Sequence, residues 1–162
     1  MIKIVKKNNE IKKLVDLAKE IWEEHYTKII GTEQVNYMLD KFQSTEAVIK
    51  QINEEGYLYY LITKNSESVG YIGVIPKRDE LYLSKCYIKS TERRKSFGRI
   101  AMDYIVDLCK EKKLKRITLN VNKNNSKSIA AYKKLNFKII DSVINDIGNS
   151  FVMDDYIMEK KI

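Results

Sequence analysis

The chain has 162 residues, 44% of them hydrophobic, with six glycines and one proline. This composition fits one domain over residues 1–162 and argues against a long disordered linker. No apolar run reaches the roughly 18 residues that a membrane-spanning helix needs, and the N-terminal stretch MIKIVKKNNE is too poor in apolar residues for a signal peptide.

The charge is unevenly divided along the chain. The formal net charge is +8, and the excess lies in residues 81–162, which hold 18 Lys and Arg against nine Asp and Glu. Such an asymmetry indicates that this half meets something anionic. A nucleic acid, a membrane surface and a phosphorylated cofactor all satisfy that condition.

In the first half, helical spacing of apolar residues predicts a helix from Ile11 to Ile29, after a short strand at residues 2–5. Gly31 is expected to end this helix, Thr32 to begin a second helix, and Ser44 to cap a third. Runs of strand-forming residues then predict three strands at 57–63, 69–75 and 81–88. The segment ESVG (67–70) is expected to form the turn between the first two strands, and Pro76 to end the second.

The second half begins with a predicted amphipathic helix, whose apolar stripe comprises Phe97, Ile100, Ala101, Tyr104, Ile105, Leu108 and Cys109. The cationic segment KEKKLKR (110–116) is expected to form the end of this helix. A strand at 117–121 and a short helix at 125–135 follow, the latter capped by Asn125 or Ser126 and ended by Asn136 in the left-handed conformation. Strands at 137–140 and 151–159 close the chain, joined near Gly148.

The predicted order is β, three helices, βββ, α, β, α, ββ. Strand–helix–strand units require crossover connections, so part of the sheet should be parallel. The expected fold class is therefore α/β, with a mixed sheet flanked by helices. Cys86 and Cys109 match neither a metal-ligand spacing nor a disulfide framework, so we expect no metal and a cytoplasmic location.

Two segments carry a resemblance to a known family. Residues 93–98 read Arg-Arg-Lys-Ser-Phe-Gly between a predicted strand and a predicted helix. Asn125 precedes Tyr132 by seven residues, and Asn136-Phe137 follows. This arrangement resembles the cofactor loop and the second signature of the GNAT superfamily of N-acetyltransferases. Ser96 stands where that family has its first loop glycine, and Asn136 where it has a glycine.

The resemblance implies the acyl-CoA N-acyltransferase fold, acetyl-CoA as cosubstrate and direct transfer of acetyl to an amine. Helix starts favour anions because their N–H groups lack intrahelical partners. The residues implied to bind the cofactor are Cys86, Tyr87, Ile88, Arg93, Arg94, Lys95, Ser96, Phe97, Gly98, Arg99, Asn125 and Ser128. If Ser96 has a positive φ, it costs roughly 1 kcal/mol relative to glycine.

Tyr132 is the implied general acid for the departing thiolate. Many relatives carry a glutamate base on the strand before the cofactor loop, where this chain has Ser84 and Lys85. His25 and a water relay remain open as the base. We do not expect Cys86 to act as a nucleophile, because it has no nearby histidine in the sequence.

The acceptor is predicted from charge. Residues 20–55 hold eight acids, and Asp154 and Asp155 lie on the closing strand, so a cationic acceptor would be attracted there. The stretch IWEEHYTKII loosely resembles bacterial polyamine N-acetyltransferases, which favours a polyamine or another small amine. The predicted substrate-side residues are His25, Tyr26, Asp154 and Asp155.

Other acceptors and other classes of protein stay open at this point. The alternative acceptors are amino acids, aminoglycosides and protein amino-termini. The alternative classes are a CoA-binding protein without catalysis and a nucleic-acid-binding module, although no nucleic-acid recognition motif is present. We expect acetyl-CoA and an amine as partners, neither a membrane nor a nucleic acid, and a monomer or homodimer.

Overall fold

A computed structural model describes residues 1–162 and contains one seven-stranded sheet in the order β1-β2-β3-β4-β5-β7-β6. The N-terminal half supplies β1 (Ile2–Ile4), β2 (Leu58–Lys64), β3 (Glu67–Pro76) and β4 (Glu80–Ile88). The C-terminal half supplies β5 (Arg116–Asn122), β6 (Lys138–Gly148) and β7 (Phe151–Lys161). Only β4 and β5 pair in parallel, and every other pair is antiparallel. The predicted α/β class with a mixed sheet is confirmed.

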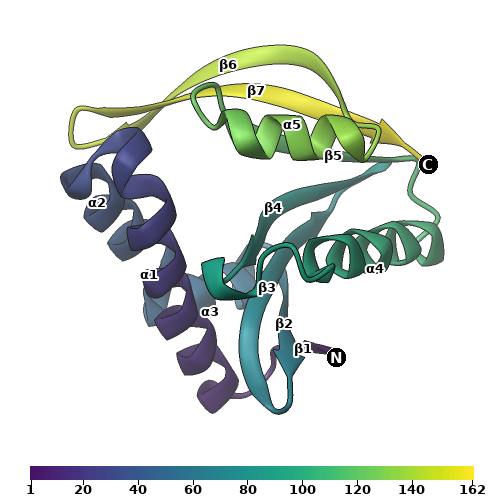
Figure 1. Ribbon diagram of the computed structural model, residues 1–162, viewed down its shortest axis with the longest axis horizontal. Helices are drawn as coiled ribbons and strands as arrows, with labels where there is room; N and C mark the ends of the chain where they lie inside the picture. Colours follow the sequence, from purple (N-terminus) through teal and green to yellow (C-terminus); the bar gives the residue numbers. More distant parts are fainter.

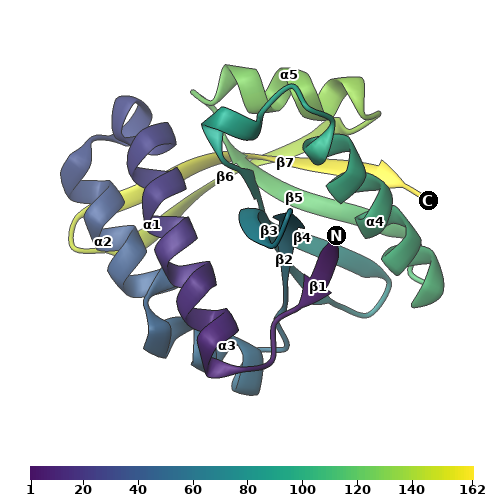
Figure 2. The same ribbon diagram turned by 60° about the horizontal axis from the view of Figure 1, so that its bottom comes forward.

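Helices cover both faces of this sheet (Figure 1). One face carries α1 (Asn8–Ile30), α2 (Thr32–Gln43) and α3 (Thr45–Glu54), and the other carries α4 (Phe97–Glu111). Helix α5 (Ser126–Lys134) lies beside the C-terminal strands, and the single turn η1 (Ser90–Glu92) links β4 to α4 (Figure 2). None of the helices is both long enough and apolar enough to cross a membrane.

The middle parts of β2 and β3 are buried on both faces of the sheet. Along β2, Tyr59 and Leu61 pack toward α1–α3, whereas Tyr60 and Ile62 pack toward α4. Successive side chains on a strand point to opposite faces, so one apolar strand serves two cores. This explains why its sequence reads as a continuous apolar run.

Several predicted boundaries are confirmed. Gly31 ends α1 with φ 86°, and Ser44 caps α3, its Oγ accepting the N–H of Ala47 at 3.2 Å. Asn136 follows α5 with φ 67°, the left-handed conformation expected after a helix end.

Other predictions about the elements are wrong. The turn between β2 and β3 lies at Asn65 and Ser66, not at ESVG (67–70), because these two residues take the positive φ values, 49° and 67°, of a tight hairpin turn. Ile100 is 47% exposed, so it does not belong to the buried stripe of α4. Successive helical residues are rotated by about 100°, and Met102 is buried instead.

Two segment lengths also differ from the prediction. Of the segment KEKKLKR, only the first two residues belong to α4, and Arg116 already begins β5. Strand β6 extends over 138–148 rather than 137–140 because it forms a long hairpin with β7.

Candidate active site

The strands β4 and β5 diverge soon after they meet, and this split opens a cavity. Their pairing is confined to Glu80–Tyr82 on β4 and Arg116–Thr118 on β5. Farther along, β4 stays paired with β3, and β5 stays paired with β7. The cavity between the separated strands has a volume of about 700 Å³, within the range of small-molecule sites in proteins.

The cavity has two chemically different sides. The side formed by the β4–α4 loop, α4 and α5, here called the α4 side, is lined by four cations: Arg93, Arg99, Lys127 and Lys134. The opposite side, here called the α1 side, is lined by aromatic residues that include Trp22, Tyr26, Phe42 and Tyr57. The α4 side is therefore suited to an anionic ligand and the α1 side to a smaller, partly apolar one.

The loop before α4 contains two residues in the left-handed backbone conformation. Arg94 and Ser96 both have positive φ, 61° and 68°, and residues of this conformation also occur in the concave backbone turns that bind anions. Gly98 lines the cavity, and a Cβ added to it would meet no atom within 4 Å. The start of α4 therefore offers N–H groups beside open space.

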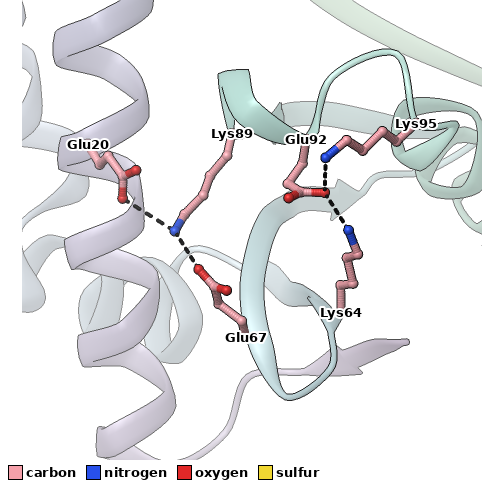
Figure 3. Close-up of polar contacts among 6 residues, drawn as sticks. All are labelled: Glu20, Lys64, Glu67, Lys89, Glu92 and Lys95. Carbon is pink, nitrogen blue, oxygen red and sulfur yellow. Dashed lines mark hydrogen bonds and ion pairs between the residues drawn. The ribbon is translucent and has the colours of Figure 1, made fainter.

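Ion pairs hold this loop against the rest of the molecule (Figure 3). Lys89, at the end of β4, pairs with Glu20 of α1 at 3.6 Å and with Glu67 of β3 at 3.3 Å. Glu92 of η1 pairs with Lys64 at 3.1 Å and with Lys95 at 3.3 Å. The Lys95 ammonium group is thus engaged with Glu92 rather than directed into the cavity.

Helix α5 brings two of the predicted residues to the cavity. The side chain of Asn125 is buried and caps the helix, its Oδ1 accepting the N–H of Ser128 at 3.4 Å. Two turns later Tyr132 lines the cavity, and its ring packs edge-on against Phe137. Burial, together with the nearby Cys86 and Tyr26, raises the pKa of Tyr132 well above its usual value. Its phenol therefore keeps its proton at neutral pH.

Asp155 of β7 is the one carboxylate that lines the cavity. The residue is only 1% exposed, and its Oδ1 has no hydrogen-bond partner in the protein. Lys123 pairs with the neighbouring Asp154 at 2.8 Å instead. Burial raises the pKa of Asp155 to about 6, even though a hydrogen bond from the Asn120 side chain to the carboxylate acts to lower it. Asp155 is therefore mostly ionised at pH 7.

A β-bulge in β4 places Lys85 in the same cavity. Lys85 pairs with Gly73 and Leu83 pairs with Val74, so the residue between them, Ser84, is the extra one. The Nζ of Lys85 donates to the Ser84 Oγ at 2.6 Å and lies 5.8 Å from the centre of the Tyr57 ring.

Cys86 lies next to Lys85 and also lines the cavity. Burial raises the pKa of its thiol to about 12, so the thiolate form is absent at neutral pH. This agrees with the expectation that Cys86 is not a nucleophile. Cys109 is fully buried in the core beneath α4, as expected.

The structure brings most of the predicted site residues together. The predicted residues that line the cavity are His25, Tyr26, Cys86, Tyr87, Ile88, Arg93, Gly98, Arg99, Asn125, Ser128, Tyr132 and Asp155. The predicted residues whose side chains do not line it are Arg94, Lys95, Ser96, Phe97 and Asp154. Phe97 packs instead against the core beneath α4.

Sequence reasoning missed Trp22, Tyr57, Lys85 and Asn120, all of which line the cavity. Trp22 and Tyr57 are ordinary core residues by pattern. Lys85 did carry a signal, because it is the lone cation inside the otherwise uncharged strand LYLSKCYI. A charge in the middle of a buried strand calls for a partner.

Comparison with known proteins identifies the family of the chain. The family model for the acetyltransferase (GNAT) family matches residues 12–137. A spermidine N(1)-acetyltransferase of Thermoplasma acidophilum is 23% identical over 149 residues, 90% of either chain. A putative [ribosomal protein bS18]-alanine N-acetyltransferase of Bacillus subtilis is 33% identical over 85 residues, which are 52% of this chain and 56% of that relative.

Solved structures of acetyltransferases share the fold. The PaiA N-acetyltransferase of Thermoplasma acidophilum, in complex with coenzyme A, superimposes with a TM-score of 0.82 at 23% identity and covers 100% of this chain and 99% of its own. The ribosomal-protein-S18-alanine N-acetyltransferase of Escherichia coli gives a TM-score of 0.72 at 17% identity, with 100% and 94% covered.

The mixed seven-stranded sheet flanked by helices is the acyl-CoA N-acyltransferase fold. The chain belongs to the acetyltransferase (GNAT) family and is an acetyl-CoA-dependent N-acetyltransferase.

Proposed function

We propose that this enzyme acetylates a small primary amine, and that the amine enters the α1 side of the cavity beside Asp155. The observation that carries this proposal is the buried Asp155 carboxylate, whose Oδ1 lacks a partner within the protein. An ammonium group would supply that partner, and a buried charge left without one is costly. The named relatives act on spermidine and on an alanine of a ribosomal protein, and both acceptors offer an amine.

The relative named for spermidine supports a polyamine as the alternative acceptor. However, none of the eight acids in residues 20–55 lines the cavity: Glu20, Glu23, Glu24, Glu33, Asp40, Glu46, Glu54 and Glu55. A polyamine would therefore meet one carboxylate inside the cavity. This favours an acceptor with a single ammonium group.

Acetyl-CoA supplies the acetyl thioester, and the α4 side fits its anionic part. The backbone N–H groups of the loop 93–99, with the side chains of Arg93 and Arg99, would hold the diphosphate. The free edge of β4 at Cys86, Tyr87 and Ile88 would hydrogen-bond the pantetheine arm, as would Asn125 and Ser128 at the start of α5.

Two side chains would handle the protons. Asp155 accepts the proton that the ammonium group must lose before its nitrogen can attack the acetyl carbonyl. Tyr132 donates a proton, or a strong hydrogen bond, to the sulfur as the C–S bond breaks. Both cysteines are free thiols, which fits the reducing cytoplasm where we place the reaction.

The proposal is tested with a panel of primary amines and acetyl-CoA, following the release of free thiol. Asp155→Asn should lower kcat on the best acceptor by about 100-fold or more, because it removes the proton acceptor but keeps the shape. Asp154→Asn is the matched control, because the Asp154 carboxylate pairs with Lys123 outside the cavity. The kcat of this variant should stay within about threefold of the parent value. Equal activity of both variants, or no acetylation of any amine, would overturn the proposal.

A further inference from the structure

Two charges of opposite sign lie in the cavity, and neither has an oppositely charged partner. Lys85 forms no ion pair, and its ammonium group donates only to the Ser84 Oγ. Asp155 forms no ion pair either, and its Oδ1 is unpartnered. An enclosed ion without a counter-charge destabilises the fold, so it is expected at positions that serve a ligand.

Both charges line the cavity, and they come from strands on opposite sides of the split in the sheet. Lys85 lies three residues beyond Tyr82, the last residue of β4 that pairs with β5. Asp155 pairs with Asn122, which lies four residues beyond the last β5 residue that pairs with β4. The two residues therefore lie three and four positions beyond the point where β4 and β5 separate, and a ligand in the cavity could contact both.

The strand around Lys85 is built to hold an extended side chain there. Gly73 of β3 lies directly opposite, and a Cβ on it would come within 3.0 Å of the Lys85 Cγ. The Ser84 Oγ, which accepts the hydrogen bond of the Lys85 ammonium group, is itself 3.1 Å from the Tyr57 hydroxyl. This chain of contacts fixes the ammonium group at the α1 side while leaving it hydrogen-bond donors for a ligand.

We propose that Lys85 binds an anionic group of the acceptor, so that the acceptor is zwitterionic: a small amino acid or a related molecule with an amine at Asp155 and an anion at Lys85. This inference rests on the proposed function, since it concerns the same acceptor. Burial lowers the pKa of Lys85 to about 8, so at pH 7 the group is still mostly charged. The aromatic α1 side would cover the apolar part of such a molecule.

The experiment compares acceptors in pairs that differ only in the carboxylate: phenylalanine with phenethylamine, leucine with isoamylamine, and γ-aminobutyrate with propylamine, with spermidine added. For at least one pair the amino acid should have a kcat/KM at least about tenfold higher, the size expected of one charge-assisted hydrogen bond. Lys85→Met should abolish that preference by raising KM for the amino acid, with less than about threefold change for its decarboxylated partner. Lys85→Arg should retain part of the preference.

Lys50→Met, on the exposed face of α3, is the matched control and should leave kcat/KM unchanged for both members of a pair. If amines without a carboxylate are acetylated as well as their amino acid partners, the inference is wrong while the proposed function stands. If Lys85→Met lowers kcat equally for both members of a pair, Lys85 acts on protons, and the inference is again wrong. If no acceptor of either kind is acetylated, the proposed function fails as well.

Discussion

The amide of Asn125, at the start of α5, donates a hydrogen bond to His25 on α1, with 3.2 Å between Nδ2 and Nε2. The Oδ1 of the same amide accepts the N–H of Ser128, which fixes the end of the amide that faces the histidine. His25 therefore carries its proton on Nδ1, and its Nε2 lone pair is already used. Burial and the nearby charges of Arg93 and Lys127 lower its pKa. We therefore expect His25 to link α1 to α5 rather than to act as the base.

We predict that Asn125→Asp raises the pKa of His25. The variant keeps an oxygen to cap α5 but presents a carboxylate to Nε2, which favours the protonated ring by about one pKa unit or more. His25 is the only histidine of the chain, so its NMR titration is read without assignment. Asn124→Asp, at the exposed neighbouring position, adds the same charge and should shift the pKa less. A parent pKa at or above the ordinary value would contradict a neutral His25 ring held by burial and the nearby cations.

Because Ser96 has a left-handed conformation, we predict that replacing it with glycine stabilises the fold. Ser96 has φ 68°, which costs roughly 1 kcal/mol more for serine than for glycine. Ser96→Gly should therefore raise the free energy of unfolding by about that amount in urea titrations, and CoA affinity should stay equal or improve. Ser126→Ala, at an exposed serine without a positive φ, is the control, and a loss of stability in Ser96→Gly would contradict the argument.

For a substitution at Gly98 we predict weaker CoA binding without a loss of fold stability. A Cβ at this position meets no atom within 4 Å, so Gly98→Val should leave the free energy of unfolding nearly unchanged. The added side chain would fill the space beside the helix start that the diphosphate needs. Millimolar CoA should raise the melting temperature of the parent but not of Gly98→Val. If the variant is stabilised by CoA as much as the parent, the loop does not hold the diphosphate.

The fold was predictable where local chemistry decides it. The caps at Ser44 and Asn136 followed from side-chain hydrogen bonding and left-handed conformation, and the structure has both. The predicted position of the hairpin turn is wrong because the true turn, at Asn65 and Ser66, contains no glycine. Asparagine nevertheless tolerates the left-handed region. The predicted strand ends too early because Asp141 and Ser142 are poor strand formers. The length of β6 is instead set by its pairing with β7.

The candidate site was predictable more fully on its α4 side than on its α1 side, where His25, Tyr26 and Asp155 were expected but Lys85 was not. Loop and helix residues such as Gly98 and Tyr132 belong to contiguous motifs, so their spacing in sequence carries information. Asp155 and Lys85 come together only through the β4–β5 split and the bulge at Ser84, which depend on the whole sheet. For the same reason the acids of α1–α3 were overestimated as acceptor ligands, since a helical acid faces the cavity only if the packing turns it inward.

Glu10 predicts acid sensitivity of the N-terminal region. Its carboxylate accepts the N–H groups of Lys6 and Lys7, each at 2.8 Å, and pairs with Lys3 at 3.0 Å. These contacts lower the pKa of Glu10 to about 2. Because the folded-state pKa is lowered, the stabilisation is complete above the ordinary value of about 4.5 and is lost as the pH falls toward 2.

Glu10→Gln should therefore lower the free energy of unfolding by about 1–3 kcal/mol at pH 7. The difference from the parent should shrink steadily below pH 4.5 in urea titrations. Asp103→Asn, at an exposed position of α4 without an ion pair, is the control. A constant difference between parent and Glu10→Gln at all pH values would show that the charge of Glu10 is not responsible.

We predict that replacing the Asp155 carboxylate raises the stability of the fold and lowers the activity. Its folded-state pKa is raised from 3.8 to about 6 by burial, so the fold favours the protonated carboxyl. The stability that this proton contributes is present at low pH and is lost as the pH rises through about 6. Asp155→Asn removes the buried charge and should be more stable than the parent at pH 7 by about 1–2 kcal/mol.

This gain should vanish near pH 4, where the parent carboxyl is protonated in the folded state. Thermal and urea unfolding across this range measure it, with Asp154→Asn as the control that lies outside the cavity. The same Asp155→Asn variant should lose activity at pH 7. A variant that is both less stable and inactive would mean that Asp155 is structural.

Tyr132 predicts a loss of turnover without a loss of cofactor affinity. Asn125 and Tyr132 are seven residues apart, about two helical turns, and both line the cavity. Tyr132→Phe removes only the hydroxyl, and the ring can still pack against Phe137. An interaction made mainly in the transition state appears in the rate rather than in ground-state binding.

The expected loss in kcat for Tyr132→Phe is about 10²–10⁴-fold, the range of positioned acid catalysis, with the Kd for CoA changed by less than about threefold. Because burial raises the pKa of Tyr132 well above its usual value, the rate of the parent should show no decline from ionisation of this phenol up to pH 9. Tyr104→Phe is the control, since that ring packs against Tyr60 in the core beneath α4. Steady-state kinetics beside calorimetric titration of CoA separate the two effects. If Tyr132→Phe turns over within about threefold of the parent on its best acceptor, the hydroxyl has no part in the chemistry, and the thiolate departs with a proton from water.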